Sequence, residues 1–437
     1  MRVVLLYPEV YDMARFAEQR KEFPPFGVLY LAAVMEDAGH DVAVRKVTPH
    51  EPDLDLSGFE AVGFSLASSA TYGILRQARR ASRIDSDALV MVGGVHANFY
   101  PEESLVDFDA DVMCEGESEH TILEVLDRAV TSRAFGGITG TLWTNGEQVH
   151  REPPRRLIGD IDCLPLPARH LLPTEDFLLS DRLAGRDLRM AHVMFSRGCP
   201  FPCSFCAAGQ TRIQYRSGVS AHTELVHLIE RYGVEGFAIV DDNFIVNKRK
   251  VSDICEQITD LGLSWSALSR VDTIDLPLLK TMAAAGCIEI KYGVESGSEA
   301  LLKAMRKNTT RAQIKRAFAA TADAGIEAKA FIIHGFPGEN TETTAETMSL
   351  LQELGTSLSR VSLFRFVPLP GTQVYADPDR HNLHGAHTQP DWDGDWSKFH
   401  IHHNDRHWWG TPEQWQDTED SYRRLRDFVE THWNRQG

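Results

Sequence analysis

Three cysteines lie within eight residues of one another, in the stretch Cys199-Pro200-Phe201-Pro202-Cys203-Ser204-Phe205-Cys206. Cysteine thiolates bind zinc and iron–sulfur clusters, and three ligands are one short of the closed four-ligand site of a structural zinc. A four-iron cluster held by three cysteines keeps one iron open to an exogenous ligand, as a catalytic site requires. The spacing therefore predicts a [4Fe–4S] cluster on Cys199, Cys203 and Cys206 rather than a disulfide framework.

Polar and glycine-containing turns follow a series of apolar segments on both sides of this triad. We expect strands near residues 189–196, 236–241, 264–270, 287–294, 328–334 and 361–367, with helical patterns between them. Alternating strands and helices form a parallel sheet, whose chemistry belongs at the carboxyl ends of the strands. The residues at those ends are Asp241, Asp242, Asn243, Arg270, Glu295, Ser296, Gly335 and Pro368. Residues 186–375 are thus predicted to form a partial (β/α)6 TIM-like barrel.

Residues 1–150 show the same alternation on a smaller scale. Apolar segments at 2–7, 41–47, 59–65, 88–92 and 110–114 are separated by helical stretches such as 26–38 and 69–83. This order predicts a doubly wound, Rossmann-like α/β domain, with Asn145-Gly146 marking a hairpin at its end. The proline pairs in residues 151–185 predict an extended linker to the barrel.

Residues 376–437 differ in composition, because six of the eight tryptophans lie there. We expect a C-terminal helical cap over the barrel mouth, with its helix near residues 413–434. Asp391, Trp392, Asp393 and Trp396 alternate acidic and aromatic side chains. Carboxylates pair with ammonium groups and aromatic faces attract cations, so this segment is predicted to bind a cationic amino sugar. A solvated acidic loop is the alternative.

The overall charge narrows the classes of partner. The chain has 437 residues, with 45 Lys and Arg against 62 Asp and Glu, which gives a net charge of −17. This balance argues against nucleic acid as a partner, because phosphate binding needs a basic surface. No apolar run approaches the roughly 20 residues of a spanning helix, and residues 1–8 read as a strand rather than a signal peptide. We therefore expect a cytoplasmic protein with no membrane partner.

The triad, placed directly after the first strand of a β/α repeat and with Phe205 before its third cysteine, resembles that of the radical SAM superfamily. The resemblance implies that the cluster cleaves S-adenosylmethionine to a 5′-deoxyadenosyl radical, with electrons from a donor such as flavodoxin or ferredoxin. It implies that Asp241, Asp242 and Asn243 hold the methionine amino group. Arg270 is the candidate for the methionine carboxylate, with Arg306 and Lys307 as rivals. Glu295 and Ser296 are expected on the ribose side and Gly335 beside the adenine, while Pro368 closes the sixth strand.

The N-terminal domain resembles the cobalamin-binding-type domains that precede many radical SAM barrels. The segments that carry this resemblance are Phe23-Pro24-Pro25-Phe26-Gly27 and Gly93-Gly94-Val95-His96. The motif Asp-x-His-x-x-Gly, which coordinates cobalt from below, does not occur in residues 1–150. Its letters occur at Asp405, His407 and Gly410, in the tail, where we interpret them as accidental. Two possibilities stay open: cobalamin binds without a protein histidine, with His96 nearest, or the fold persists without cobalamin.

The whole chain is similar to the radical SAM diol dehydratases of apramycin-type aminoglycoside biosynthesis. This resemblance implies dehydration of an amino-sugar 1,2-diol, namely C3′ deoxygenation of paromamine, followed by an NADPH-dependent reductase. Tyr215, Glu295 and the tail aspartates are the candidates for protonating the leaving hydroxyl. The alternative is a cobalamin-dependent C- or P-methyltransferase of a natural-product pathway, which consumes two S-adenosylmethionines and needs a corrin. The motifs at successive strand ends argue against a non-catalytic sensor.

Overall fold

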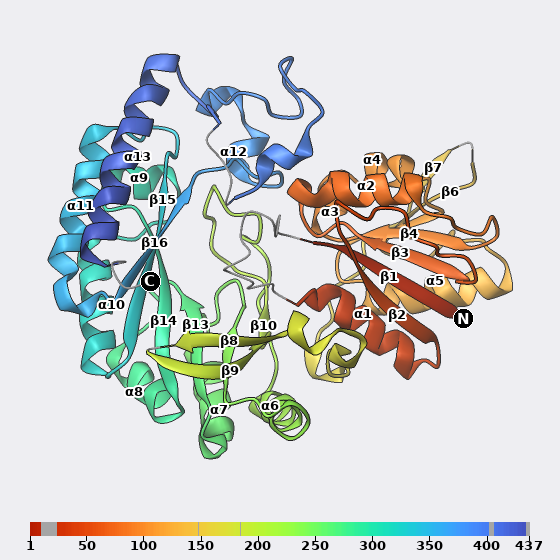
Figure 1. The fold of residues 1–437 in the computed structure, drawn as a ribbon, viewed down its shortest axis with the longest axis horizontal. Helices are drawn as coiled ribbons and strands as arrows, with labels where there is room; N and C mark the ends of the chain where they lie inside the picture. The colour runs from red at the N-terminus through yellow and green to blue at the C-terminus, as the bar shows by residue number, and fades with distance from the viewer. Residues whose placement is uncertain (10–23, 147, 184, 402–405, 434–437) are drawn as a thin grey trace. The chain divides into compact units, whose positions relative to one another are not determined.

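The computed structural model describes residues 1–9, 24–146, 148–183, 185–401 and 406–433 (Figure 1). The chain divides into two compact units. The first comprises Met1–Phe177 together with Asp395–Lys398, and the second comprises Leu178–Gly394 and Phe399–Gly437. No helix in the described ranges has both the length and the apolar character needed to cross a bilayer.

The first unit is built on a seven-stranded sheet in the order β2-β1-β3-β4-β5-β6-β7. Its strands are β1 (Arg2–Pro8), β2 (Asp41–Val47), β3 (Ala61–Ser65), β4 (Leu89–Gly93), β5 (Val112–Cys114), β6 (Thr141–Thr144) and β7 (Val149–Arg151). Strands β1 to β5 are parallel, while β6 and β7 form the expected antiparallel hairpin. The strand order reverses between β1 and β3, and ligands of such sheets bind at this reversal. The predicted doubly wound domain is therefore confirmed.

Helices cover both faces of this sheet, so its central strands are buried. They are α1 (Phe26–Asp37), α2 (Tyr72–Ala81), α3 (Val95–Phe99), α4 (Pro101–Asp107) and α5 (Glu119–Thr131). Figure 1 shows α1 and α5 on one face and α2, α3 and α4 on the other. This arrangement explains the continuous apolar runs in β1 and β3, because strands of a parallel sheet are covered on both sides.

The second unit contains a curved sheet in the order β16-β15-β14-β13-β12-β9-β8. The six expected strands are present as β9 (Arg186–Val193), β12 (Gly236–Ile239), β13 (Ser264–Ser269), β14 (Cys287–Glu295), β15 (Glu327–His334) and β16 (Arg360–Arg365). They are all parallel, as a partial barrel requires. Strand β8 (Leu178–Leu183) pairs antiparallel with β9 and lies in the segment interpreted from sequence as linker.

The helices of this unit connect successive strands and lie outside the curved sheet (Figure 1). They are α6 (Gly218–Tyr232), α7 (Lys248–Ile258), α8 (Leu276–Ala284), α9 (Glu299–Ala304), α10 (Arg311–Asp323) and α11 (Thr341–Leu354). The short α12 (Gln373–Ala376) follows β16. Trp265 of β13 lies in the core, where its ring stacks on Phe237 at 5.8 Å and its indole N–H donates to the Ala285 carbonyl at 2.7 Å.

The C-terminal helix α13 (Pro412–His432) packs along α11. The helix predicted near residues 413–434 is therefore present. Its first turn is fixed by a capping box between Thr411 and Gln414. Farther along, the Glu419 carboxylate accepts hydrogen bonds from both Nη atoms of Arg365, at the end of β16. Because such bidentate pairs fix orientation as well as distance, the helix has one register against the sheet.

The turn between α8 and β14 offers a test of the core. Gly286 has φ +92°, and a Cβ there would lie 2.1 Å from the Leu263 carbonyl oxygen. Gly286→Ala should therefore cost about 2–4 kcal/mol of stability, since both strain and a backbone clash must be relieved. Gly262→Ala is the matched control: its φ is +65°, but nothing lies within 4 Å, so about 1 kcal/mol is expected. Urea unfolding of the full chain measures both; equal losses would contradict the steric account.

Candidate active site

The cysteine loop is closed at its base by backbone contacts. β10 (Ser196–Arg197) precedes the loop and pairs antiparallel with β11 (Gln214–Tyr215) behind it. Cys199 and Thr211 exchange hydrogen bonds, because the Cys199 amide donates to the Thr211 hydroxyl at 2.8 Å and the Thr211 amide donates to the Cys199 carbonyl at 3.0 Å. Gly198 has φ +85°, and a Cβ there would lie 2.5 Å from the Arg212 carbonyl oxygen. Only glycine allows the two ends of the loop to approach this closely.

The three thiols lie in an environment that disfavours charge unless a ligand offsets it. Cys199 and Cys203 are each 8% exposed, and Cys206 is partly buried. Burial raises the pKa of Cys203, and it raises the pKa of Cys206 to about 11. In the described part of the chain, no group of three His, Cys, Asp or Glu side chains lies close enough together to hold a single metal ion. Cysteine thiolates are the ligands that iron–sulfur clusters take, so the chemistry of this donor set fits such a cluster.

Two of the three polar residues after β12 have different environments. Asp241 is 2% exposed and points back toward the first strand, where it accepts from the Phe195 amide at 2.9 Å and the Ser196 hydroxyl at 2.6 Å. Burial raises its pKa to about 8, although these hydrogen bonds oppose the rise. Asp241 therefore holds the chain that leads into the cysteine loop. The exposed Asp242 carboxylate lies beside the Gly198 amide of the loop itself.

Asn243 is the third of these residues and is only 2% exposed. Within the described residues, neither its amide oxygen nor its amide nitrogen has a hydrogen-bond partner. A buried amide without partners costs free energy, so such a group is usually completed by a ligand or an ordered water. The carboxyl end of β12 therefore offers one donor and one acceptor to a bound molecule.

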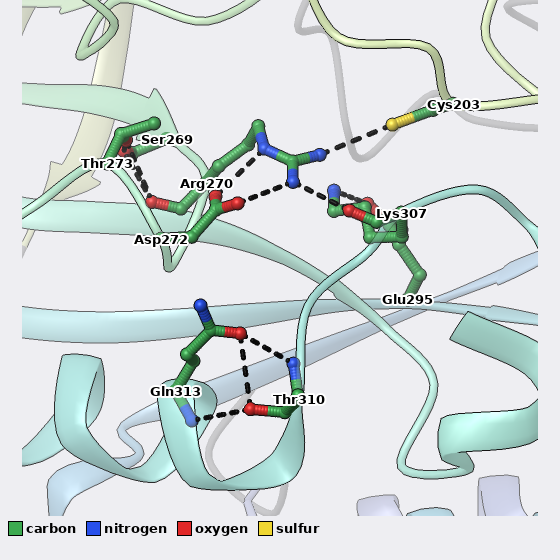
Figure 2. Close-up of polar contacts among 9 residues, drawn as sticks. All are labelled: Cys203, Ser269, Arg270, Asp272, Thr273, Glu295, Lys307, Thr310 and Gln313. Atoms are coloured by element: carbon green, nitrogen blue, oxygen red, sulfur yellow. Dashed lines mark hydrogen bonds and ion pairs between the residues drawn. The ribbon is translucent and has the colours of Figure 1, made fainter. Parts of the chain in front are cut away.

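The Arg270 guanidinium is the centre of a polar network beside Cys203 (Figure 2). It forms a bidentate ion pair with Asp272, with Nε–Oδ1 and Nη2–Oδ2 distances of 2.9 and 2.8 Å. Nη2 also donates to the Lys307 carbonyl at 2.7 Å, and Nη1 lies 3.3 Å from the Cys203 sulfur. The fork thus holds a carboxylate of the chain itself, and the methionine-carboxylate role implied by the resemblance stays a prediction.

Lys307 and Glu295 form a second buried pair in the same network. The Lys307 Nζ lies 2.7 Å from the Glu295 Oε1, and both side chains are less than a tenth exposed. A Cβ on Gly293 would lie 2.4 Å from that carboxylate oxygen and 2.7 Å from the ammonium nitrogen. The glycine therefore makes room for the ion pair. The rival Arg306 is exposed and donates to Gln373 at 2.5 Å.

The remaining strand-end candidates contact other parts of the barrel. The Ser296 hydroxyl lies 3.3 Å from that of Thr347 in α11. The Gly335 carbonyl accepts from the Trp409 indole at 2.7 Å, which joins this turn to the tail. Pro368 is buried after β16, and Phe205 is half-buried in the cysteine loop. None of these contacts places them on a ligand, so their expected roles stay predictions.

Tyr215 lies close to the loop but its hydroxyl is engaged. It donates to the Phe244 carbonyl at 2.6 Å and accepts from the amides of Val246 and Asn247, both at 3.1 Å. Burial raises its pKa to about 12. Through these hydrogen bonds Tyr215 holds the backbone of the turn after β12, in which Asn243 lies.

The four tail residues predicted to bind an amino sugar are spread over two units. In the second unit, Asp391 accepts from the Gly385 amide at 2.7 Å, and Asp393 lies 3.5 Å from Arg406. The Trp392 ring packs against Phe399, with centroids 6.1 Å apart. Trp396 belongs to the first unit. The structure thus gives each carboxylate a contact within the tail.

In the first unit, Trp396 packs at the carboxyl ends of β3 and β4. Its ring centroid lies 4.8 Å from that of His96 and 4.9 Å from that of Tyr100. His96 is fully buried, with its Nδ1 2.9 Å from the Ser69 hydroxyl. His96 is therefore packed against aromatic rings, and its expected place nearest a cobalamin stays a prediction. Asp405 of the accidental motif lies outside the described residues, and His407 contacts the Gly410 carbonyl.

Sequence reasoning did not assign roles to Asp272 or Gly293. Asp272 follows Arg270 by two residues, and this spacing was the available signal for an ion pair. The importance of Gly293 depends on a contact between side chains twelve positions apart, Glu295 and Lys307, so no local pattern reveals it.

Comparison with known proteins agrees with this geometry. The sequence profile of the Radical SAM superfamily matches residues 193–351, and that of the B12 binding domain matches residues 14–126. An uncharacterized methyltransferase of Pyrococcus horikoshii is 31% identical over 378 residues, which cover 82% of this chain and 79% of the relative. The anaerobic magnesium-protoporphyrin IX monomethyl ester cyclase of Rubrivivax gelatinosus is 26% identical over 403 residues, covering 86% and 70% of the two chains.

Among solved structures, the cobalamin-dependent S-adenosylmethionine radical enzyme OxsB, with aqua-cobalamin and S-adenosylmethionine bound, superposes with a TM-score of 0.74. The superposition covers 99% of this chain and 71% of OxsB at 16% identity, so it speaks for the fold. The two matching profiles lie in the two units, with the B12 binding domain first and the radical SAM domain second. The second profile includes the cysteine loop. The chain belongs to the radical SAM superfamily, among the members whose barrel follows a B12-binding domain.

Proposed function

We propose that the protein is a cobalamin-dependent radical SAM methyltransferase acting on a small-molecule acceptor. The observation that carries this proposal is the 31% identity to a methyltransferase along both units. The cyclase relative has lower identity, at 26%, and neither of these relatives is a dehydratase. The tail contacts weaken the amino-sugar reading further, because Asp391 and Asp393 are engaged within the tail. Methyl transfer thus replaces dehydration as the favoured activity.

The cysteine loop and the end of β12 have the donors that a cluster and S-adenosylmethionine need. Three partly or fully buried thiols supply the cluster ligands, and the orphan amide of Asn243 supplies both a donor and an acceptor. Asp242, beside the loop, is the carboxylate suited to a methionine ammonium group. When bound, the cluster supplies the electron that cleaves S-adenosylmethionine. The chain's own part is to hold that molecule and exclude water.

The first unit supports corrin binding through its sheet edge rather than through a histidine. Gly94 has φ +104°, and a Cβ there would lie 2.9 Å from backbone atoms of Leu66, so the turns after β3 and β4 pack tightly. Gly116, after β5, has nothing within 4 Å of its Cβ position, which leaves open space at the same edge. Because His96 is enclosed, we infer that a corrin would bind here without this histidine as a cobalt ligand.

The net reaction replaces a hydrogen of the acceptor with a methyl group. One S-adenosylmethionine gives the methyl and leaves as S-adenosylhomocysteine. A second accepts one electron and a hydrogen atom of the acceptor, giving methionine and 5′-deoxyadenosine. A second electron would return a bound corrin to the state that takes up the next methyl group. The electrons come from a one-electron donor such as flavodoxin or ferredoxin.

Reconstituted, reduced protein incubated with hydroxocobalamin and trideuteromethyl-labelled S-adenosylmethionine tests this activity without a known acceptor. We expect corrin absorption that survives desalting, labelled methylcobalamin, and S-adenosylhomocysteine in equal amount. Mass spectrometry and the visible spectrum measure these products. Formation of 5′-deoxyadenosine with no corrin retained, together with loss of water from paromamine, would instead restore the dehydratase reading.

Replacing Cys199, Cys203 or Cys206 by Ala should remove the cluster, because each supplies one of three ligands. Iron content should fall and 5′-deoxyadenosine formation should drop below detection. Cys163→Ser is the matched control, since this thiol is exposed and lies outside the loop. Full iron content in the Cys203→Ala protein would refute the assignment.

Asn243→Leu, which keeps the side-chain volume but removes both polar amide atoms, should weaken S-adenosylmethionine binding about tenfold, the effect of losing a hydrogen bond of about 1.5 kcal/mol. Equilibrium binding to the reconstituted protein measures this, with iron content as the check that the cluster is intact. Unchanged affinity at full iron content would place the ligand elsewhere.

A further inference from the structure

We propose that Arg270 is a positioning residue for the iron–sulfur cluster. One N–H of its guanidinium donates to the Cys203 sulfur and thereby sets the reduction potential of the cluster. This inference rests on the cluster site of the proposed function and does not depend on methyl transfer. It gives Arg270 a task different from the binding of a methionine carboxylate. The argument comes from the number of donors that the guanidinium has left.

A guanidinium has five N–H donors in a fixed plane. Four of them are used here: two on the Asp272 carboxylate, one on the Lys307 carbonyl and one on the Cys203 sulfur. The Asp272 pair takes the edge formed by Nε and Nη2, which is a fork for a carboxylate. Among the described residues, one N–H of Nη1 remains without an acceptor, so a second bidentate carboxylate cannot be bound without breaking this network (Figure 2).

The position of the guanidinium is fixed from several sides. The side chain is 5% exposed, and its Cζ lies 4.0 Å from the centroid of the Phe201 ring, which belongs to the cysteine loop. Cation–π packing and the Asp272 fork together hold one orientation, in which Nη1 faces the sulfur. The loop and the strand end of β13 are thereby joined through one side chain.

The surrounding charges are paired, so the N–H to sulfur bond costs little in buried charge. Arg270 is balanced by Asp272, and Lys307 is balanced by Glu295 at 2.7 Å. Breaking a buried pair by removing one member is expensive, because the other charge is left uncompensated. The network therefore keeps a donor on Cys203 without an unpaired ion beside the cluster.

A hydrogen bond to a ligating sulfur stabilises the negative charge that the cluster gains on reduction, which raises its potential. Loss of the donor should make the cluster harder to reduce. A methionine-carboxylate role would leave the potential of the cluster unchanged when S-adenosylmethionine is absent. The potential measured without S-adenosylmethionine therefore separates the two roles.

The experiment uses the full chain, reconstituted with iron and sulfide, as wild type, Arg270→Lys and Arg270→Gln. Potentiometric titration followed by electron paramagnetic resonance gives the midpoint in the absence of S-adenosylmethionine. We expect a more negative midpoint in both variants and the larger shift in Arg270→Gln, which loses the charge as well. Arg311→Lys is the matched control: Arg311 also donates to carbonyls, those of Gly297 and Glu346, but not to a cysteine, so its midpoint should equal that of wild type.

Asp272→Asn in both backgrounds tests whether Asp272 acts through Arg270. It should shift the midpoint in wild type and leave it unchanged in Arg270→Gln, because the group it orients is then absent. If neither Arg270 variant retains iron, the single Asp272→Asn protein decides by its own shift. Wild-type midpoints in cluster-loaded variants would overturn the inference, as would an altered affinity for S-adenosylmethionine with no altered midpoint. Absence of a cluster from wild type would instead refute the proposed cluster site.

Discussion

The cost of burying three thiolates within eight residues is the constraint on which the barrel's active end depends. Buried thiols resist ionisation, as the raised pKa values of Cys203 and Cys206 indicate, yet metal ligands must be thiolates. The chain offsets part of this cost with the Arg270 guanidinium, held 3.3 Å from one sulfur. Such a cation is tolerated in the interior because Asp272 and the Lys307 carbonyl occupy its other donors.

Close backbone approaches make this arrangement possible. Gly198 lets the cysteine loop close against Arg212, and Gly293 leaves space for the Lys307–Glu295 pair. Tyr215 and Asp241 then tie the loop's base to the turn and strand of β12 through the Phe244 carbonyl and the Phe195 amide. These residues share a function: they fix the backbone from which the ligating and binding side chains project. Two of them were given other roles from the sequence: Asp241 as a contact of the methionine amino group and Tyr215 as a proton donor to a leaving hydroxyl.

Periodicity and spacing predicted the parts of the fold that depend on local sequence. The six barrel strands, the doubly wound sheet and the cysteine triad follow from apolar runs, turn residues and a short motif. The partners of Arg270 and Glu295 could not be predicted in the same way, because Cys203, Lys307 and Phe201 come from distant segments. β8 was also missed, since proline pairs before it gave the whole segment the character of a linker.

Trp396 shows how far tertiary contacts can change the meaning of a sequence pattern. In the chain it stands beside alternating aspartates, which suggested an aromatic platform for a sugar. In the structure its ring packs on His96 and Tyr100 of the first unit, while Asp391 and Asp393 make contacts within the tail. The same contact packs the Trp396 ring against His96. Because residues 1–150 also lack the cobalt-ligating motif, the corrin binding that we propose relies on backbone groups and on shape rather than on a protein imidazole.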